Sequence, residues 1–470
     1  MKKGFLLLFS LLTLSLAVSC GEDDGNGSSA VSVSFANQSV NLTEAATPVN
    51  IKFSTPPATA GEIVIDFSMA NVTYGEDFTT TPVAENNKLT VPFNAGASNV
   101  SFTINKLTTV DIQGTVTFEI VSVSNGALIT GITATVANFY EAPSLGTLVQ
   151  VEVGGPTQPN QVYVDLSSGG LITVPRVSWD LGFYSGDKFR VVLNGSLKMT
   201  AKALNTTNID EVAQEDSSML FGQGEGAANV VDHPSGDLTK TVIAEVSDNA
   251  DDNKVYLINL GNGPASVPPA VGTDGSAGGA QRGWKKIRVL KSGNDYVVQF
   301  ADIAATTHQQ ITITKDSAYN YSFFSFTTGA TGQVEPQKNQ WDLNFTTFTN
   351  FVDNAGTEVP YYYPDFIVTN VKGGARSYQV LTEEFSYDAF TKANVVEANF
   401  TDDQRNIGSN WRSTSIMGPN GFPVSQFVLK TDRFFVVKDP AGNLYKLKMT
   451  GGANEAGERG FPQFEYKLLQ

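Results

Sequence analysis

The stretch Val177-Ser178-Trp179-Asp180-Leu181-Gly182-Phe183 returns as Asn339-Gln340-Trp341-Asp342-Leu343-Asn344-Phe345, with Trp341 standing 162 residues after Trp179. An alternating stretch that reaches a glycine precedes each copy, at 161–170 and 321–330. A matching hairpin follows each copy, at 286–296 and 433–443. A repeat of this length is too long for a solenoid. The sequence therefore predicts a duplicated β module.

The composition places the chain among all-β proteins. Its 470 residues are enough for about three domains of ~150 residues each. Hydrophobic residues make up 41% and charged residues 17%, which is sufficient to bury a core. The 43 glycines and abundant Thr and Ser favour strands and turns. We expect an N-terminal β-sandwich at 31–141, followed by two related antiparallel β halves, a first half at 145–310 and a second half at 311–470.

The N-terminus is typical of an export signal and is set apart from the fold. Lys2 and Lys3 precede an apolar run over 5–18, which ends in Leu16-Ala17-Val18-Ser19-Cys20. These residues resemble a bacterial lipobox, which implies cleavage of a signal peptide at 1–19 and lipidation of Cys20. The alternative is an ordinary signal peptide with a chance cysteine. Cys20 is the only cysteine, so no internal disulfide can form.

Residues 20–30 form an acidic, Gly-rich tether. It resembles the signal that sends lipoproteins of Bacteroidetes-type bacteria to the outer face of the outer membrane, although it would also serve as a plain solvated linker. Loss of two lysines with the signal peptide changes the net charge from −16 to −18. Such a charge repels phosphate backbones, so nucleic acid is not an expected partner. A lipid anchor would attach the protein to a membrane without spanning it.

The 31–141 region alternates apolar and polar residues with period two, as expected for a sandwich. Strands are expected at 31–35, 49–53, 62–66, 89–93, 100–104 and 116–120. Tyr74-Gly75-Glu76-Asp77-Phe78 and the Ala95-Gly96-Ala97 turn make the region similar to a Calx-beta domain. That family often binds calcium, and Glu44 and Asp77 stand where two ligands would be. Only Asp111 represents the later acidic pair, so a metal-free spacer is the favoured interpretation.

Both halves are expected to be antiparallel sheets. Asn194-Gly195 after 189–193 is typical of a hairpin turn. Further strands are expected at 296–300, 445–449 and 464–468, and helices only at 209–214 and 387–399. Long connections at 205–254, 352–411 and 261–283 are where we expect a ligand, because structureless loops of such length are often functional.

The Trp-Asp pairs themselves suggest packing and not chemistry. A Trp on a strand is usually core with its indole N–H satisfied, and the Asp beside it usually binds a backbone N–H or an Arg. As a fingerprint they are informative. Trp179-Asp180-Leu181-Gly182-Phe183, the 189–193 strand and the terminal 434–448 hairpin make about 320 residues resemble the HmuY family. The resemblance implies a β fold that holds haem, taken up through an outer-membrane receptor.

The resemblance implies haem iron held between two histidines, one of them just after the Trp-Asp strand. The chain departs from this pattern, since it has only two histidines and neither follows a Trp-Asp strand. Haem iron takes imidazole, thioether, thiolate or phenolate ligands. The haem-ligand candidates are therefore His233, His308, Met219, Met417 and the tyrosines. For both histidines the alternative is a solvent-facing residue, and for both methionines it is plain packing.

Catalytic patterns are missing from the sequence. Two isolated histidines do not suit a Ser-His-Asp triad, and no Gly-x-Ser-x-Gly or phosphate-binding glycine motif occurs. We expect no enzyme but a lipid-anchored surface protein that binds haem or a related tetrapyrrole for uptake. The alternative is a binding or adhesion protein that recognises a peptide, glycan or partner protein through its long loops. A hydrolase is a more distant third.

Overall fold

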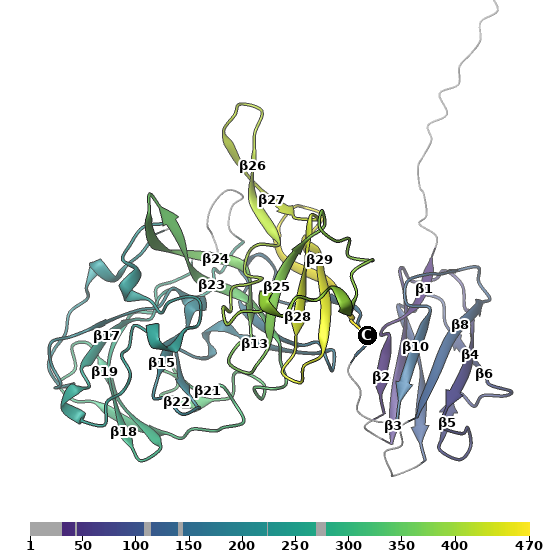
Figure 1. Cartoon of the computed structure of the whole chain (residues 1–470), viewed down its shortest axis with the longest axis horizontal. Helices are drawn as coiled ribbons and strands as arrows, with labels where there is room; N and C mark the ends of the chain where they lie inside the picture. Colours follow the sequence, from purple (N-terminus) through teal and green to yellow (C-terminus); the bar gives the residue numbers. More distant parts are fainter. Residues whose placement is uncertain (1–30, 43–44, 108–113, 140–143, 223, 269–278) are drawn as a thin grey trace, which may run out of the picture.

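The structure is a computed structural model that describes residues 31–42, 45–107, 114–139, 144–222, 224–268 and 279–470. Across these residues the protein is all-β, with strands joined by turns and 3-10 helices and without an α-helix, which confirms the predicted fold class. A sandwich at the N-terminal end lies beside a larger body formed by the two halves (Figure 1).

The sandwich consists of two five-stranded sheets facing each other across an apolar core. One sheet has the order β5 (Phe78–Thr81), β7 (Asn99–Lys106), β3 (Ala46–Phe53), β1 (Ser32–Phe35), β9 (Leu128–Ile129). The other has the order β2 (Ser39–Asn41), β10 (Ala134–Asn138), β8 (Thr115–Val123), β4 (Gly61–Ala70), β6 (Lys88–Phe93). Alternating burial along β3 and β6 puts one face of each strand in the core, as the period-two pattern predicts.

The larger body has four main sheets and one projecting hairpin. The outer sheets are β16 (Thr200–Ala203), β17 (Val255–Asn259), β18 (Trp284–Ser292), β19 (Asp295–Asp302), β20 (Gln309–Ile313), and β11 (Leu148–Gln150), β30 (Arg459–Leu468), β29 (Leu444–Ala453), β28 (Arg433–Lys438), β25 (Arg376–Leu381). The inner sheets are β13 (Gly170–Pro175), β12 (Asn160–Asp165), β23 (Leu343–Asn354), β24 (Thr357–Thr369), and β15 (Val191–Leu193), β14 (Leu181–Tyr184), β21 (Tyr321–Ser325), β22 (Ala330–Gly332). The hairpin is β26 (Arg412–Met417) and β27 (Pro423–Leu429).

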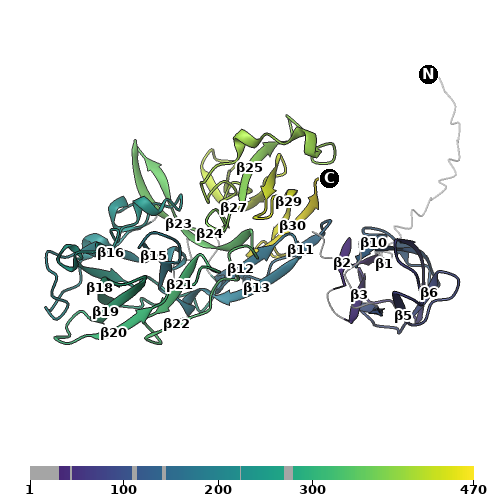
Figure 2. The ribbon, with the colours of Figure 1, turned by 60° about the horizontal axis from the view of Figure 1, so that its bottom comes forward.

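The two halves exchange their first hairpins. The β12–β13 hairpin of the first half pairs with β23 of the second half, with Val164 opposite Leu343. The β21–β22 hairpin of the second half pairs with β14 of the first half, with Phe324 opposite Leu181. In Figure 2, β12 and β13 lie beside β23 and β24, and β21 and β22 lie beside β15. The cores follow the exchange, because Val162 packs among residues of the second half.

The order of the outer sheets corrects one sequence match. Each outer sheet ends in the strand that precedes an exchanged hairpin, β20 in one sheet and β11 in the other. Counting inward from these edges makes β19 the equivalent of β30, β18 of β29 and β17 of β28. The hairpins at 286–296 and 433–443 both exist, but they differ by one strand in position. The long 260–283 connection hides the true counterpart, the β17–β18 pair.

Three local predictions were wrong. Asn194-Gly195 is not a two-residue hairpin, since β15 and β16 belong to different sheets and Asn194 instead caps the 3-10 helix η3 (Gly195–Leu197). Neither predicted helix forms: 209–211 is turn and bend and 212–214 is irregular, and the 387–399 region holds only the short η9 (Lys392–Asn394) and η10 (Glu397–Asn399). The 352–411 connection is not structureless, because β24 and β25 lie within it.

The remaining 3-10 helices lie in the connections of the first half: η1 (Gly155–Thr157), η2 (Arg176–Ser178), η4 (Ser217–Met219), η5 (Ala228–Val230), η6 (Leu238–Lys240) and η7 (Ala250–Asp252). Asx caps begin several of them, such as Asp237 accepting a hydrogen bond from the N–H of Thr239 at 2.9 Å.

Candidate functional site

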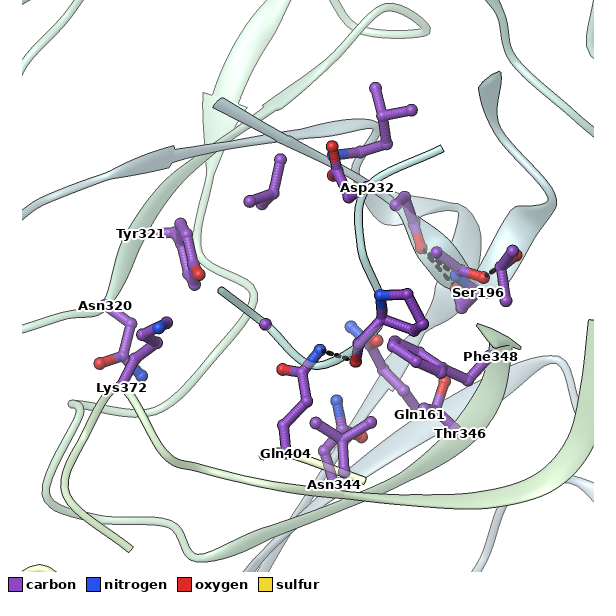
Figure 3. A pocket seen from close by; sticks show the side chains of 18 of the residues that line it. Gln161, Ser196, Asp232, Asn320, Tyr321, Asn344, Thr346, Phe348, Lys372 and Gln404 are labelled. Carbon is purple, nitrogen blue, oxygen red and sulfur yellow. Dashed lines mark hydrogen bonds between the residues drawn. The ribbon is translucent and has the colours of Figure 1, made fainter. Parts of the chain in front are cut away.

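The two halves enclose a cavity of about 160 Å³ at their junction. Its wall is built from β12, β21, the segments 192–199 and 231–241 of the first half, and the segments 344–349 and 368–372 of the second half. Figure 3 shows Lys372, Asn320 and Tyr321 on one side and Ser196 and Phe348 on the opposite side. The exchange of hairpins creates this site, because it places β12 and β21 beside strands of the other half in one cavity wall.

Both repeated tryptophans line the cavity in equivalent positions. The ring of Trp179 contacts Phe323 edge-on at 4.8 Å, and the ring of Trp341 contacts Tyr163 in the same way at 4.9 Å. Each aromatic partner comes from the hairpin of the other half. Both indole N–H groups are shielded from solvent and have no hydrogen-bond acceptor among the described residues, contrary to the prediction that they would be satisfied.

The aspartates and two asparagines repeat this symmetry. Asp180 accepts the N–H of Phe326, and Asp342 accepts the N–H of Leu166, both at 2.7 Å. Asn194 donates through Nδ2 to the carbonyl of Trp179 at 2.9 Å, and Asn370 donates to that of Trp341 at 2.8 Å. The two aspartates thus bind backbone N–H groups, as predicted, and the duplication holds at the level of single hydrogen bonds.

Two buried carboxyl groups in the wall have their oxygens occupied by backbone N–H groups. Oε1 of Glu335 accepts from Asn320 at 2.7 Å and from Tyr321 at 2.9 Å. Burial raises the pKa of Glu335 to about 8, against these hydrogen bonds, so that it is mostly protonated at pH 7. Asp232 accepts from Leu193 and Val242, and burial raises its pKa to about 6.

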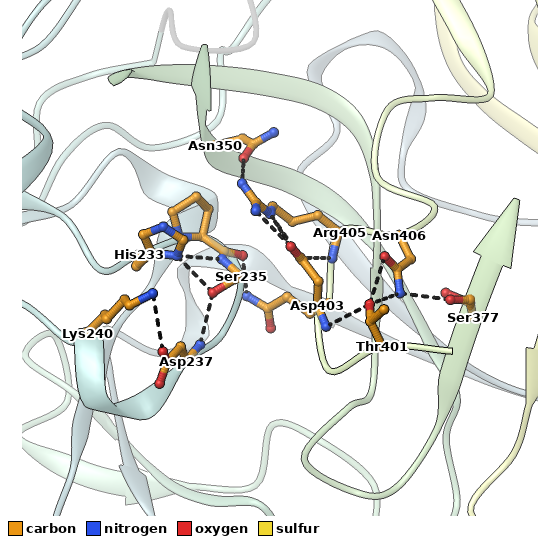
Figure 4. A network of polar contacts seen from close by, with 12 residues as sticks. His233, Ser235, Asp237, Lys240, Asn350, Ser377, Thr401, Asp403, Arg405 and Asn406 are labelled. Atoms are coloured by element: carbon orange, nitrogen blue, oxygen red, sulfur yellow. Dashed lines mark hydrogen bonds and ion pairs between the residues drawn. The ribbon is translucent and has the colours of Figure 1, made fainter. Parts of the chain in front are cut away.

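Of the histidine and methionine candidates for haem ligation, His233 lines the cavity, as do the tyrosines Tyr163 and Tyr321. Nδ1 of His233 lies 2.8 Å from Oγ of Ser235 and accepts the N–H of Ser235 at 3.3 Å (Figure 4). Burial first, and then Lys240 and Arg405, lower the pKa of His233, so the ring is neutral at pH 7.

The loop that carries His233 is fastened to the second half. Gln404 donates through Nε2 to the carbonyl of Pro234 at 2.9 Å, and the carbonyl of Ser235 accepts the N–H of Gln404 at 3.1 Å. Next to Gln404, Arg405 pairs with Asp403 at 2.7 Å (Figure 4). The first long connection therefore contributes to the site, as its length suggested.

The other predicted ligands lie apart from the cavity wall. Met219 is fully buried in a separate apolar cluster with Leu257 and Tyr362. Met417 is 70% exposed at the end of β26. The side chain of His308 is 26% exposed and pairs with Asp210 at 2.8 Å. The structure does not bring these three residues together.

The calcium candidates are only partly described. Glu44 and Asp111 lie outside the described residues, as does the lipidation candidate Cys20. Asp77 uses Oδ2 to accept the N–H of Thr73 at 2.8 Å, which closes a local turn. Within the described ranges, no three His, Cys, Asp or Glu side chains are grouped as a metal site.

Two residues of the wall were missed in the sequence. Met199 is buried and lines the cavity, six residues beyond the 189–193 stretch. Lys372 follows β24 in a Gly-rich turn, two residues after Asn370, the structural counterpart of Asn194. Neither stands in a recognisable motif.

Comparisons with known proteins agree with the duplication. The HmuY protein family model matches twice, at residues 157–314 and 317–466. No curated protein is significantly similar to the chain. In the described part of the chain, no helix has the length and apolar character to cross a bilayer.

Solved structures share less with the chain. The apo HmuY analogue of Tannerella forsythia is 16% identical, with 40% of this chain and 96% of that chain covered and a TM-score of 0.18. A HmuY-like protein of Bacteroides vulgatus is 9% identical, covering 69% and 91%, with a TM-score of 0.18. The apo Calx CBD1 domain is 13% identical, covering 23% and 94%, with a TM-score of 0.20. These scores support no argument, whereas the family match spans most of the chain: the protein belongs to the HmuY family and contains its domain twice.

Proposed function

We propose that the protein is a lipid-anchored surface protein that binds a ligand in the cavity between its two halves and catalyses no reaction. The observation that carries this proposal is the cavity itself, which both copies of the Trp-Asp strand line in equivalent positions. Enclosed apolar sites with a few polar groups are the usual form of ligand sites. The lipobox-like residues ending at Cys20 support the anchor, and an outer-membrane receptor would be the partner.

Haem or a related tetrapyrrole is the ligand that family membership suggests for uptake. The imidazole of His233 and the thioether of Met199 both line the cavity, and both are ligand types that haem iron accepts. Bound iron would supply the coordination bonds, while the aromatic walls would pack against the ring.

The volume of the cavity also suits a ligand smaller than haem. A cavity of about 160 Å³ is close to the ~150 Å³ of a cavity that holds one benzene molecule, whereas a tetrapyrrole, with four linked pyrrole rings, would extend beyond it. This volume favours the second candidate, a small non-haem ligand at the same site.

Titration of the purified protein with haemin separates the two candidates. If haem is the ligand, a saturable Soret shift is expected that His233→Ala and Met199→Leu both weaken. His308→Ala is the matched control, because His308 lies outside the cavity and its loss should leave the titration unchanged. Absence of a shift in both the ferric and ferrous states would remove haem and leave the small ligand.

A further inference from the structure

We propose that the cavity takes a small molecule with a flat unsaturated ring and a carboxylate, and that the ammonium group of Lys372 binds the carboxylate. This inference rests on the proposed function, since it assigns a ligand class to the same cavity.

Lys372 is the charged side chain of the wall that has no hydrogen bond or ion pair to any described residue. The acids nearest in its electrostatic surroundings are Asp237 and Asp402, and both are engaged elsewhere. Asp402 pairs with Arg376 at 2.5 Å, and Asp237 lies 3.5 Å from Lys240. Partial burial lowers the pKa of Lys372. A half-buried ammonium with three donors and no acceptor is stabilised by an anion that brings its own oxygens.

The backbone that carries Lys372 is held in place before any ligand arrives. Oδ1 of Asn370 accepts the N–H of Gly373 at 2.9 Å and Nδ2 of Asn320 at 2.9 Å. Nδ2 of Asn370 is bonded to the carbonyl of Trp341. The turn is therefore fixed to the tryptophan strand and to the start of β21, and it presents Lys372 on the side opposite Phe348 (Figure 3). A rigid turn costs little ordering free energy on binding.

The carboxyl groups of the wall leave room for a negative charge. Glu335 is mostly protonated at neutral pH, and its Oε1 already accepts two N–H groups. The two oxygens of Asp232 each accept a backbone N–H, which stabilises that charge locally. Asp237, which also lines the wall, pairs with Lys240 at 3.5 Å. None of the three carboxyl groups is ion-paired with Lys372, so its ammonium group is free to meet a ligand.

The rest of the wall fits a single ring. The edge-on pairs Trp179–Phe323 and Trp341–Tyr163 frame two sides, and Phe348 closes a third. Aromatic walls favour flat partners in offset or edge-on contact. The cavity volume of about 160 Å³ has room for a ring of about the size of benzene.

Isothermal titration with benzoate and benzamide tests the inference, because the two probes share a shape and differ in charge. We expect benzoate to bind the full chain about 10-fold more tightly than benzamide, a difference of about 1.4 kcal/mol. Lys372→Met should reduce benzoate affinity to that of benzamide and leave benzamide affinity within about two-fold. Lys338→Met is the control. Lys338 is exposed and lies near Trp341 in the sequence, so its substitution removes the same charge from the surface.

The outcomes distinguish this inference from the proposed function. Equal affinity for the two probes, or a benzoate preference that survives in Lys372→Met, would overturn the carboxylate assignment while cavity binding stands. Binding of haemin with no binding of either probe would also overturn it, in favour of the tetrapyrrole. If neither probe nor haemin binds, both proposals fail together.

Discussion

At the scale of one residue, the raised pKa of Glu335 makes the stability of the protein depend on pH. Its carboxyl group is 3% exposed and bonded to the start of β21, so the folded protein favours the protonated form. The pKa is about 8 in the folded protein against an ordinary value of 4.5. The folded state therefore binds more protons than the unfolded state between these values, and stability falls as pH rises from about 4.5 to about 8.

Replacing Glu335 with Gln should flatten this pH dependence. The amide keeps an oxygen for the two N–H groups but does not ionise, so we expect Glu335→Gln to be more stable than the parent at pH 9 by about 1–3 kcal/mol. At pH 5, where the parent is protonated, the two proteins should differ little. Urea unfolding at both pH values measures the effect. An equal difference at pH 5 and pH 9 would contradict the burial of an ionisable group here.

At the scale of elements, the exchanged segments depend on close backbone contact. Gly460 at the start of β30 has a φ of +91°, and a Cβ there would lie 2.1 Å from the carbonyl oxygen of Gly155 in η1. Gly457, three residues earlier, has a φ of +77° but open space around it. Gly460 therefore meets the first half at a point where only glycine fits.

These two glycines allow the contact to be measured separately from backbone strain. Gly457→Ala should cost about 1 kcal/mol through its left-handed backbone alone. Gly460→Ala should lower the free energy of unfolding by a further ~1–3 kcal/mol, because the 155–157 segment must move away from the added methyl group. Denaturant midpoints of the two variants give the comparison. Similar losses in both would show that η1 does not pack on β30 as described.

The strands and the repeat could be predicted from the sequence because short stretches of neighbouring residues are enough to identify both. Alternation along 100–104 or 464–468 and the two Trp-Asp pairs need no knowledge of the partner strand. The exchange could not be predicted, since nothing local decides whether β12 pairs with β14 or β23. The predicted helix at 387–399 failed because Tyr387 and Phe390 instead pack against Phe434 of the neighbouring sheet.

The candidate site was only half predictable for the same reason. The long 205–254 connection and His233 were both identified, because length and residue type are visible in one sequence. Met199 and Lys372 became candidates only when the exchange brought the 192–199 and 368–372 segments to one wall. A site that is assembled from two copies has no contiguous motif.

At the scale of the whole molecule, the two halves form one folding unit and the sandwich forms another. Every strand of the sandwich pairs within it, and its core is its own. By contrast, Val149 and Val162 of the first half pack in the core of the second half. Among the described residues, two hydrogen bonds from the 145–147 segment, to Ser39 and Ala36, join the body to the sandwich.

A cut between 314 and 317 should therefore abolish folding of either piece alone. Each piece lacks the hairpin that completes its inner sheet, so we expect residues 144–314 and 317–470 to be insoluble when expressed singly and to copurify when expressed together. The sandwich, as residues 31–139, is the control and should fold alone. Circular dichroism and size-exclusion chromatography provide the measurement. A folded, monomeric 317–470 piece would show that the exchange is dispensable.

The pairing of β11 with β30 also sets an order of events during synthesis. Leu148 lies opposite Glu465, so β11, the first strand of the module, can pair only after β30, its last strand, has been synthesised. Contacts between such distant parts of a chain form slowly. A nonsense mutation before residue 463 would therefore remove the β30 residues that pair with β11 and leave β11 without a neighbouring strand as well.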